Sequence, residues 1–134
     1  MNHITTEMKP AMEGIVPSFI VTCSEDGVPN ISYISQVFYV DDQHVAISHQ
    51  FFNKSVKNFQ KNPQVCVCIV NPDDGIMWKL DLHHSHGETD GPLFNKMNAQ
   101  LEAIATMTGM EDVFKLKAAE IFTVLSIEQV GSPD

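Results

Sequence analysis

Short turns between apolar segments are the feature that most restricts the fold of this chain. Turn sequences at residues 24–27, 41–43 and 71–75 each separate two apolar segments of strand length. A connection this short joins antiparallel neighbours, because a crossover between parallel strands needs a dozen residues or more. The chain is therefore predicted to be mainly β and antiparallel, and its pattern does not suit a doubly wound parallel sheet.

The hydrophobic pattern predicts six strands and two to three helices in the order βββ-α-ββ-α-β. Strands are expected at 15–23, 28–40, 44–49, 65–70, 76–84 and 119–127. Helices are expected at 53–62 and from about residue 90 to Gly109, with a short one within 4–13 that Pro10 limits. This order suits an antiparallel barrel with helices over its gaps. The long strand 28–40 should overhang the barrel and invite a second subunit through Tyr33, Val37 and Tyr39.

The segment between Gln43 and Pro72 contains no acidic residue, although the whole chain has 17 acids against 8 bases. Lys54, Lys57 and Lys61 lie in this segment and create a local positive field. Asn53 is a good N-cap, so Lys54 and Ser55 are expected in the first helical turn, where free N–H groups and the helix dipole favour an anion. The alternative is a solvated, lysine-rich helix face.

The strength of such an anion site limits the ligands that suit it. A charge-assisted hydrogen bond contributes roughly 1.5–3 kcal/mol and the dipole about 0.3–1 kcal/mol. One helical turn therefore falls short of the roughly 8 kcal/mol that micromolar affinity requires. A phosphate attached to a flat aromatic body fits better, with the phosphate at the helix start and the ring against strands.

Charge and composition restrict the partners further. The net charge of −9 argues against nucleic acid or an anionic membrane surface as the main partner. No apolar run approaches 18 residues, so we expect a single domain over 1–134 in the cytoplasm. The three cysteines, Cys23, Cys66 and Cys68, lack Cys-x-x-Cys spacing and are expected to be buried, reduced thiols.

A histidine cluster, His83-His84-Ser85-His86, is the other notable group. On a strand His84 and His86 share a face and could bind a metal, with Asp81 or Glu88 as a third ligand. A polar strand end is the preferred interpretation, because no further spaced His or Cys completes the site, and no metal is expected. Acid–base catalysis by one of these histidines is also open.

From about Gly14 to Ile127 the chain resembles the pyridoxamine 5′-phosphate oxidase-like FMN-binding split-barrel family. The resemblance depends on the hairpin ending in EDGVPN at 25–30, the long second strand, and the segment NKSVKNFQKNP at 53–63. It implies a homodimer with FMN at the subunit interface. A deazaflavin or haem could replace FMN in this fold.

The resemblance also implies which residues bind the cofactor. The isoalloxazine ring would lie along the second strand, beside Ser32, Tyr33, Ile34, Ser35 and Gln36. The ribityl phosphate would contact Ser48, His49, Asn53, Lys54 and Ser55, with Lys57 one turn further on. The chain departs from the family in two ways, since it has no arginine and lacks the basic substrate-phosphate motif of vitamin B6 oxidases at 126–134.

The expected function is that of an FMN-dependent oxidoreductase that acts on a small molecule or a reduced nicotinamide. The missing substrate motif leaves a non-catalytic flavin carrier or redox sensor as the alternative. No residue is singled out as a catalytic acid or base.

Overall fold

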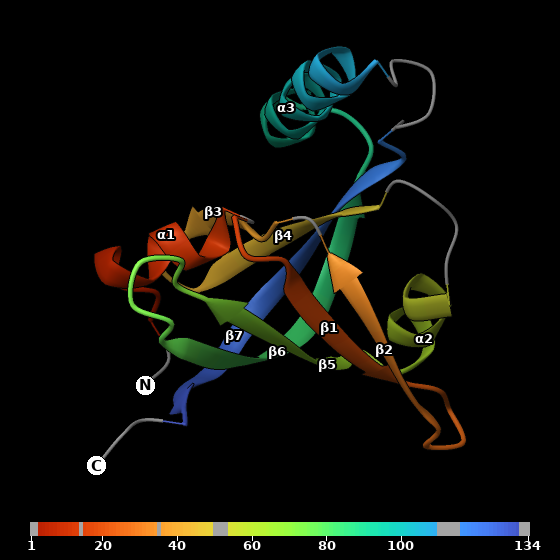
Figure 1. Ribbon diagram of the computed structural model, residues 1–134. Helices are drawn as coiled ribbons and strands as arrows, with labels where there is room; N and C mark the ends of the chain where they lie inside the picture. The colour runs from red at the N-terminus through yellow and green to blue at the C-terminus, as the bar shows by residue number, and fades with distance from the viewer. Residues whose placement is uncertain (1–2, 14, 35, 50–53, 110–115, 132–134) are drawn as a thin grey trace.

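The computed structural model describes residues 3–13, 15–34, 36–49, 54–109 and 116–131, and within them seven strands form one antiparallel sheet (Figure 1). The strands are β1 (Ser18–Cys23), β2 (Pro29–Ile34), β3 (Phe38–Asp41), β4 (His44–His49), β5 (Gln64–Val70), β6 (Met77–Glu88) and β7 (Ala118–Val130). The helices are the 3-10 turn η1 (Thr6–Met8), α1 (Lys9–Met12), α2 (Lys54–Lys61) and α3 (Pro92–Thr108). The predicted mainly β, antiparallel class is confirmed.

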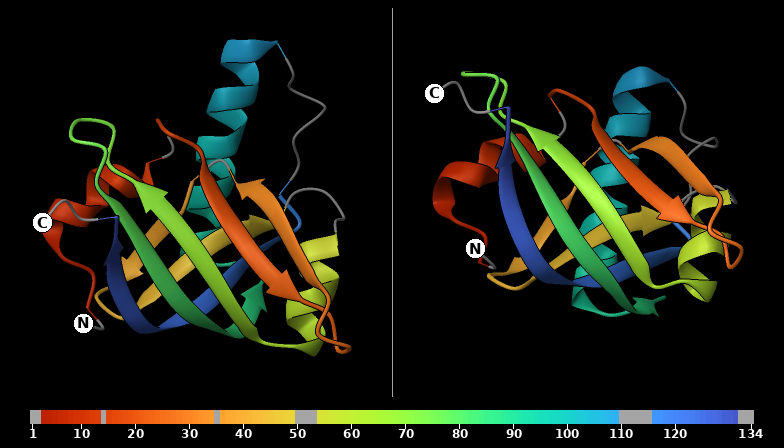
Figure 2. Two further views of the ribbon diagram at one scale, coloured as in Figure 1. Left: turned by 60° about the horizontal axis from the view of Figure 1, so that its bottom comes forward. Right: turned by 90° about the horizontal axis from the view of Figure 1, so that it is seen from below.

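The sheet is rolled, and its connectivity requires this. Its strand order is β2-β1-β5-β6-β7-β4-β3, so β2 and β3 are successive in the chain but lie at opposite edges. The segment from Ile34 at the end of β2 to Phe38 at the start of β3 spans at most about 14 Å. A flat sheet of this order would hold its edges roughly 29 Å apart. The sheet must therefore curl until its edges approach each other, as the two views of Figure 2 show.

The prediction of one strand over 28–40 is wrong, and this error explains why the strand count rises from six to seven. The chain leaves one sheet edge after Ile34 and joins the other edge at Phe38. Between them, the Val37 N–H donates to the Met12 carbonyl at 2.9 Å, and the Val37 side chain is buried in the core. The expected overhang of a single long strand is therefore absent, and Tyr33 and Tyr39 lie on different edge strands.

The core fills the interior of the rolled sheet. Alternate residues of the central strands point inward, such as Val67 and Ile69 of β5 and Leu80 and Leu82 of β6. Helices α1 and α2 lie at opposite ends of the sheet (Figure 1), and Met12 and Phe59 reach from them into the same cluster. A smaller cluster joins α3 to β4 and β7 through Ala46, Met97, Leu101, Leu116, Ala119 and Ile121.

The remaining elements lie close to their predicted positions. The strand 44–49 coincides with β4, and α3 ends at Thr108 before Gly109, which has a φ of 73° as a C-terminal cap requires. The short N-terminal helix is divided into η1 and α1, with Pro10 in the first turn of α1. Cys23, Cys66 and Cys68 are free thiols as expected, but they are half-buried rather than buried. In the described part of the chain, no helix has the length and apolar character needed to span a membrane.

Candidate functional site

A small cavity lies where the start of α2 meets β2, β4 and β7. Its volume is about 40 Å³. It is lined by Ile20, Ser32, Tyr33, Ile34, Ile47, Ser48, His49, Ser55, Val56, Phe59 and Glu120. The structure thus brings together six of the residues that the sequence assigned to a cofactor: Ser32, Tyr33, Ile34, Ser48, His49 and Ser55.

The other predicted cofactor residues lie elsewhere or outside the described residues. Gln36 lines a separate hollow beside Lys9 and Lys96, and Lys57 lines another beside Glu25 and Asp26. Lys54 is exposed at the start of α2. The positions of Ser35 and Asn53 fall outside the described residues.

The acidic turn after β1 offsets part of the predicted positive field. Lys57 and Lys61 share a hollow with Glu25 and Asp26, and Lys61 Nζ is 3.9 Å from Glu25 Oε1. The segment 43–72 contains no acid in the sequence. In the folded protein, however, Glu25 and Asp26 lie beside Lys57 and Lys61. Lys54 is therefore the lysine of this group best suited to an external anion.

Hydrogen bonds fix the first turn of α2 against the sheet. Asn30 Nδ2 donates to Ser55 Oγ at 3.1 Å and to Ser32 Oγ at 3.4 Å, and the two serine hydroxyls are 3.1 Å apart. One turn later, Asn58 Nδ2 donates to Thr22 Oγ1 at 3.0 Å in a buried contact. The start of α2, where the helix dipole is positive, is therefore held beside the cavity.

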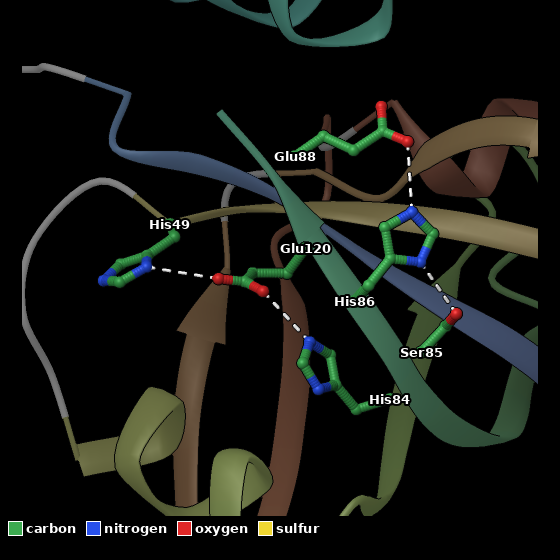
Figure 3. Close-up of polar contacts among 6 residues, drawn as sticks. All are labelled: His49, His84, Ser85, His86, Glu88 and Glu120. Atoms are coloured by element: carbon green, nitrogen blue, oxygen red, sulfur yellow. Dashed lines mark hydrogen bonds and ion pairs between the residues drawn. The ribbon is translucent and has the colours of Figure 1, made fainter. Parts of the chain in front are cut away.

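A buried carboxylate with two histidine partners forms the other polar part of the cavity wall (Figure 3). Glu120 of β7 is only 5% exposed. Its Oε1 is 3.0 Å from His84 Nε2, and its Oε2 is 3.3 Å from His49 Nδ1. The His84 ring packs against both Phe59 and Phe122, with centroid distances of 4.7 and 5.1 Å.

The two histidines keep this buried carboxylate ionised. Burial by itself raises the pKa of Glu120, but the hydrogen bonds and charge of His84 and His49 outweigh burial, so the pKa lies below its ordinary value. Gly87 is the cross-strand partner of Glu120, and a Cβ at Gly87 would lie 2.7 Å from Glu120 Oε1. The carboxylate therefore occupies space that only a glycine leaves open.

The histidine cluster does not form the metal pair that its spacing suggested. The pairing of β6 with β7 shifts register between His84 and His86, so the two side chains have different partners. His84 contacts Glu120, whereas His86 is exposed and contacts Glu88 at 3.1 Å (Figure 3). Within the described ranges, no group of three or more His, Cys, Asp or Glu residues is arranged to hold a metal ion.

The sequence analysis missed Asn30 and Glu120 as parts of this site. Asn30 carries no local signal beyond its place in the hairpin. Glu120 does carry one, because it is the single charged residue in the apolar strand segment 118–125. An acid in such a segment is buried only if it has partners, and those partners are distant in sequence.

The seven-stranded rolled sheet, with a cavity at the start of α2, defines a small antiparallel β-barrel protein. The protein-family model described as pyridoxamine 5′-phosphate oxidase matches residues 4–125. The chain therefore belongs to this family, as the resemblance in its sequence predicted.

An uncharacterised protein of Methanocaldococcus jannaschii is 36% identical over 73 residues, which cover 53% of this chain and 48% of that protein. The match thus spans about half the length of this curated relative.

Solved structures share the fold. An FMN-binding protein from Syntrophomonas wolfei has a TM-score of 0.76 at 15% identity, covering 95% of this chain and 88% of that one. HupZ of Group A Streptococcus has a TM-score of 0.74 at 19% identity, covering 96% and 95%. HutZ, a haem storage protein from Vibrio cholerae, has a TM-score of 0.63 at 17% identity, covering 92% of each chain. At these identities the likeness shows the fold alone.

Proposed function

We propose that this protein binds FMN in the cavity at the start of α2 and acts as a flavin-dependent oxidoreductase on a small molecule or a reduced nicotinamide. The observation that carries the proposal is the meeting of Ser32, Ser48 and Ser55 in one cavity beside a helix start. Family membership and the FMN-binding protein of the same fold support it.

The residues present suit the two chemical parts of FMN. Hydroxyl groups of Ser48 and Ser55, the positive end of the α2 dipole and the Lys54 ammonium suit a phosphate. Ser32, Tyr33 and Ile34 on β2 would lie along the ring. Ser35 and Asn53 stay predictions. We leave Gln36 and Lys57 out of the proposed site, because they line other hollows.

The size of the cavity supports a homodimer as part of the proposal. A cavity of about 40 Å³ holds one or two water molecules, whereas FMN is many times larger. Most of the cofactor must therefore lie against a further surface. Ile31 and Tyr33 of the neighbouring edge strand β2 are 65% and 72% exposed, and a second copy of the chain would cover them.

When bound, the flavin supplies the electron chemistry. The residues of this chain bind the phosphate, orient the ring along β2 and keep water from the part of the cofactor that they enclose. The half-buried contacts among Asn30, Ser32 and Ser55 hold these groups in place before the ligand arrives, which lowers the entropy cost of binding.

Titration with FMN tests the site, and Lys54→Ala is compared with Lys61→Ala as the matched control. Both variants remove one lysine charge from α2, but Lys61 pairs with Glu25. Loss of one charge-assisted contact should raise the Kd of Lys54→Ala roughly 10-fold or more, with the largest effect at low salt. Lys61→Ala should stay within about 2-fold. Equal effects of the two substitutions would show that the phosphate lies elsewhere.

The alternative is a non-catalytic flavin carrier or redox sensor. The observation that favours it is that residues 126–134 lack the basic substrate-phosphate motif of vitamin B6 oxidases. Anaerobic reduction of the flavin-loaded protein by NADH or NADPH separates the two functions. Turnover with an added electron acceptor supports the oxidoreductase, and tight FMN binding without turnover supports the carrier or sensor.

A further inference from the structure

His49, at the end of β4, has one ring nitrogen that the protein leaves without a partner. Its Nδ1 is 3.3 Å from Glu120 Oε2, whereas its Nε2 is buried and has no hydrogen-bond partner among the described residues. A buried polar atom without a partner destabilises the protein, because it has lost its hydrogen bonds to water. Because His49 lines the cavity, a ligand there is well placed to supply the missing partner.

The contact with Glu120 decides what Nε2 can do. An ionised carboxylate only accepts hydrogen bonds, so the ring nitrogen that faces it must carry a hydrogen. In a neutral imidazole only one nitrogen carries hydrogen, and in His49 that nitrogen is Nδ1. Nε2 of a neutral His49 is then a bare lone pair, which accepts a hydrogen bond and cannot donate one.

A second histidine shares the same carboxylate. His84 Nε2 is 3.0 Å from Oε1 and His49 Nδ1 is 3.3 Å from Oε2, so each carboxylate oxygen faces one ring nitrogen. Two imidazolium rings on one buried carboxylate would leave an excess positive charge, which burial disfavours.

The same carboxylate argues against a phosphate at this end of the cavity. Glu120 is ionised and forms part of the cavity wall, where like charges repel strongly because water is scarce. The helix start and Lys54 attract an anion, but the wall at His49 and Glu120 does not. The helix start therefore favours a negatively charged group of the ligand, whereas the wall at His49 and Glu120 disfavours one.

Resting on the proposed flavin site, we infer that His49 accepts a hydrogen bond through Nε2 from a ribityl hydroxyl or a ring N–H of the flavin and does not contact the phosphate. Glu120 is the positioning residue that fixes the Nδ1–H form of His49, and His84 supports Glu120 from the other side (Figure 3). This inference moves His49 away from the phosphate group to which the sequence assigned it.

Nitrogen NMR of the histidine rings in flavin-free protein tests the hydrogen position without any ligand. His49 should carry its hydrogen on Nδ1 in the wild-type protein at pH 7.5. Glu120→Gln should release this preference, since an amide can either donate or accept. Glu128→Gln is the control, because Glu128 lies on the same strand but pairs with Lys79 at the surface. A His49 that carries hydrogen on Nε2 in the wild-type protein would overturn the inference.

Titrations with FMN and with riboflavin, which lacks the phosphate, test the contact. His49→Ala should raise the Kd of both flavins by a similar factor of roughly 5–30, whereas Lys54→Ala should weaken FMN and spare riboflavin. If His49→Ala weakens FMN alone, His49 contacts the phosphate and the inference is wrong. A wild-type protein that binds neither flavin would refute the proposed function, while the NMR result would still decide the state of His49.

Titration with haemin provides a further check. A lone pair held by a carboxylate is also suited to a metal ion. A haemin absorption band that depends on His49 would show that Nε2 binds iron, and this result would also overturn the inference. We expect no such dependence.

Discussion

Replacement of Gly87 by alanine tests whether space on β6 holds Glu120 in its position. Gly87 does not have a positive φ, so its backbone accepts an alanine. In most strands this substitution stabilises a protein by about 0.5–1 kcal/mol, because glycine loses more entropy on folding. At Gly87 the added Cβ would lie 2.7 Å from Glu120 Oε1, which is too close for any carbon–oxygen contact. We therefore expect the opposite sign.

The size of the effect follows from the contacts of the carboxylate. An ordinary contact requires Glu120 to retreat by about 0.5–1 Å, and this movement breaks or weakens the 3.0 Å hydrogen bond of Oε1 to His84. A hydrogen bond to a charged group contributes roughly 1.5–3 kcal/mol. After subtraction of the usual gain from alanine, Gly87→Ala should destabilise the fold by about 1–2 kcal/mol, or roughly 3–8 °C in Tm.

Urea and thermal unfolding of four proteins measure this coupling: wild type, Gly87→Ala, Glu120→Ala and the double variant. Glu120→Ala removes the atoms with which the new Cβ collides, so Gly87→Ala should be neutral or stabilising in that background. The reasoning is refuted if Gly87→Ala stabilises the wild-type protein, or if it destabilises both backgrounds equally.

Three further outcomes follow from the contacts described above. Burial alone would raise the pKa of Glu120, but its histidine partners lower it; the ionised form therefore adds stability above the ordinary pKa and loses it as the pH falls through the lowered value. The unfolding free energies of wild type and Glu120→Gln should accordingly converge as the pH falls below the ordinary pKa of a glutamate. Burial, together with the nearby Cys68 and Asp81, raises the pKa of Cys66 to about 12. Iodoacetamide at pH 8 should therefore label Cys66 far more slowly in the folded than in the unfolded protein. Equal labelling rates would contradict this prediction. Asn58→Ala should cost about 1–2 kcal/mol in urea unfolding through its bond to Thr22, whereas the exposed Gln60→Ala should change little.

Local signals in the sequence were enough to predict most elements. The turn at 41–43 defines the start of β4, and the glycine at 109 defines the end of α3, because turn and cap residues act within a few positions. The segment 28–40 could not be divided in this way. Its apolar pattern runs on past Ile34, and the break depends on a bond between Val37 and Met12, which no local pattern reveals.

The candidate site was predictable only in part. Ser32, Ser48 and Ser55 come from three separate elements, and a resemblance to a family, not their spacing, suggested that they meet. Glu120 is 71 positions from His49 and 36 from His84, so only the paired strands bring these three side chains together. The lysines show a different limit of the sequence. Lys57 and Lys61 belong to a positive run in the sequence, but they acquire acidic neighbours once the chain folds.

The position of β7 bears on how the protein is made in the cell. This strand lies between β6 and β4, although it is synthesised after the other six. Before it emerges, the strands described here fall into two groups, β2-β1-β5-β6 and β4-β3, with no hydrogen-bonded ladder between them. A ribosome must therefore release the chain through Val130 before the barrel can close. The proposed cofactor would then be loaded only after β7 has emerged, and a product truncated before β7 could not retain it.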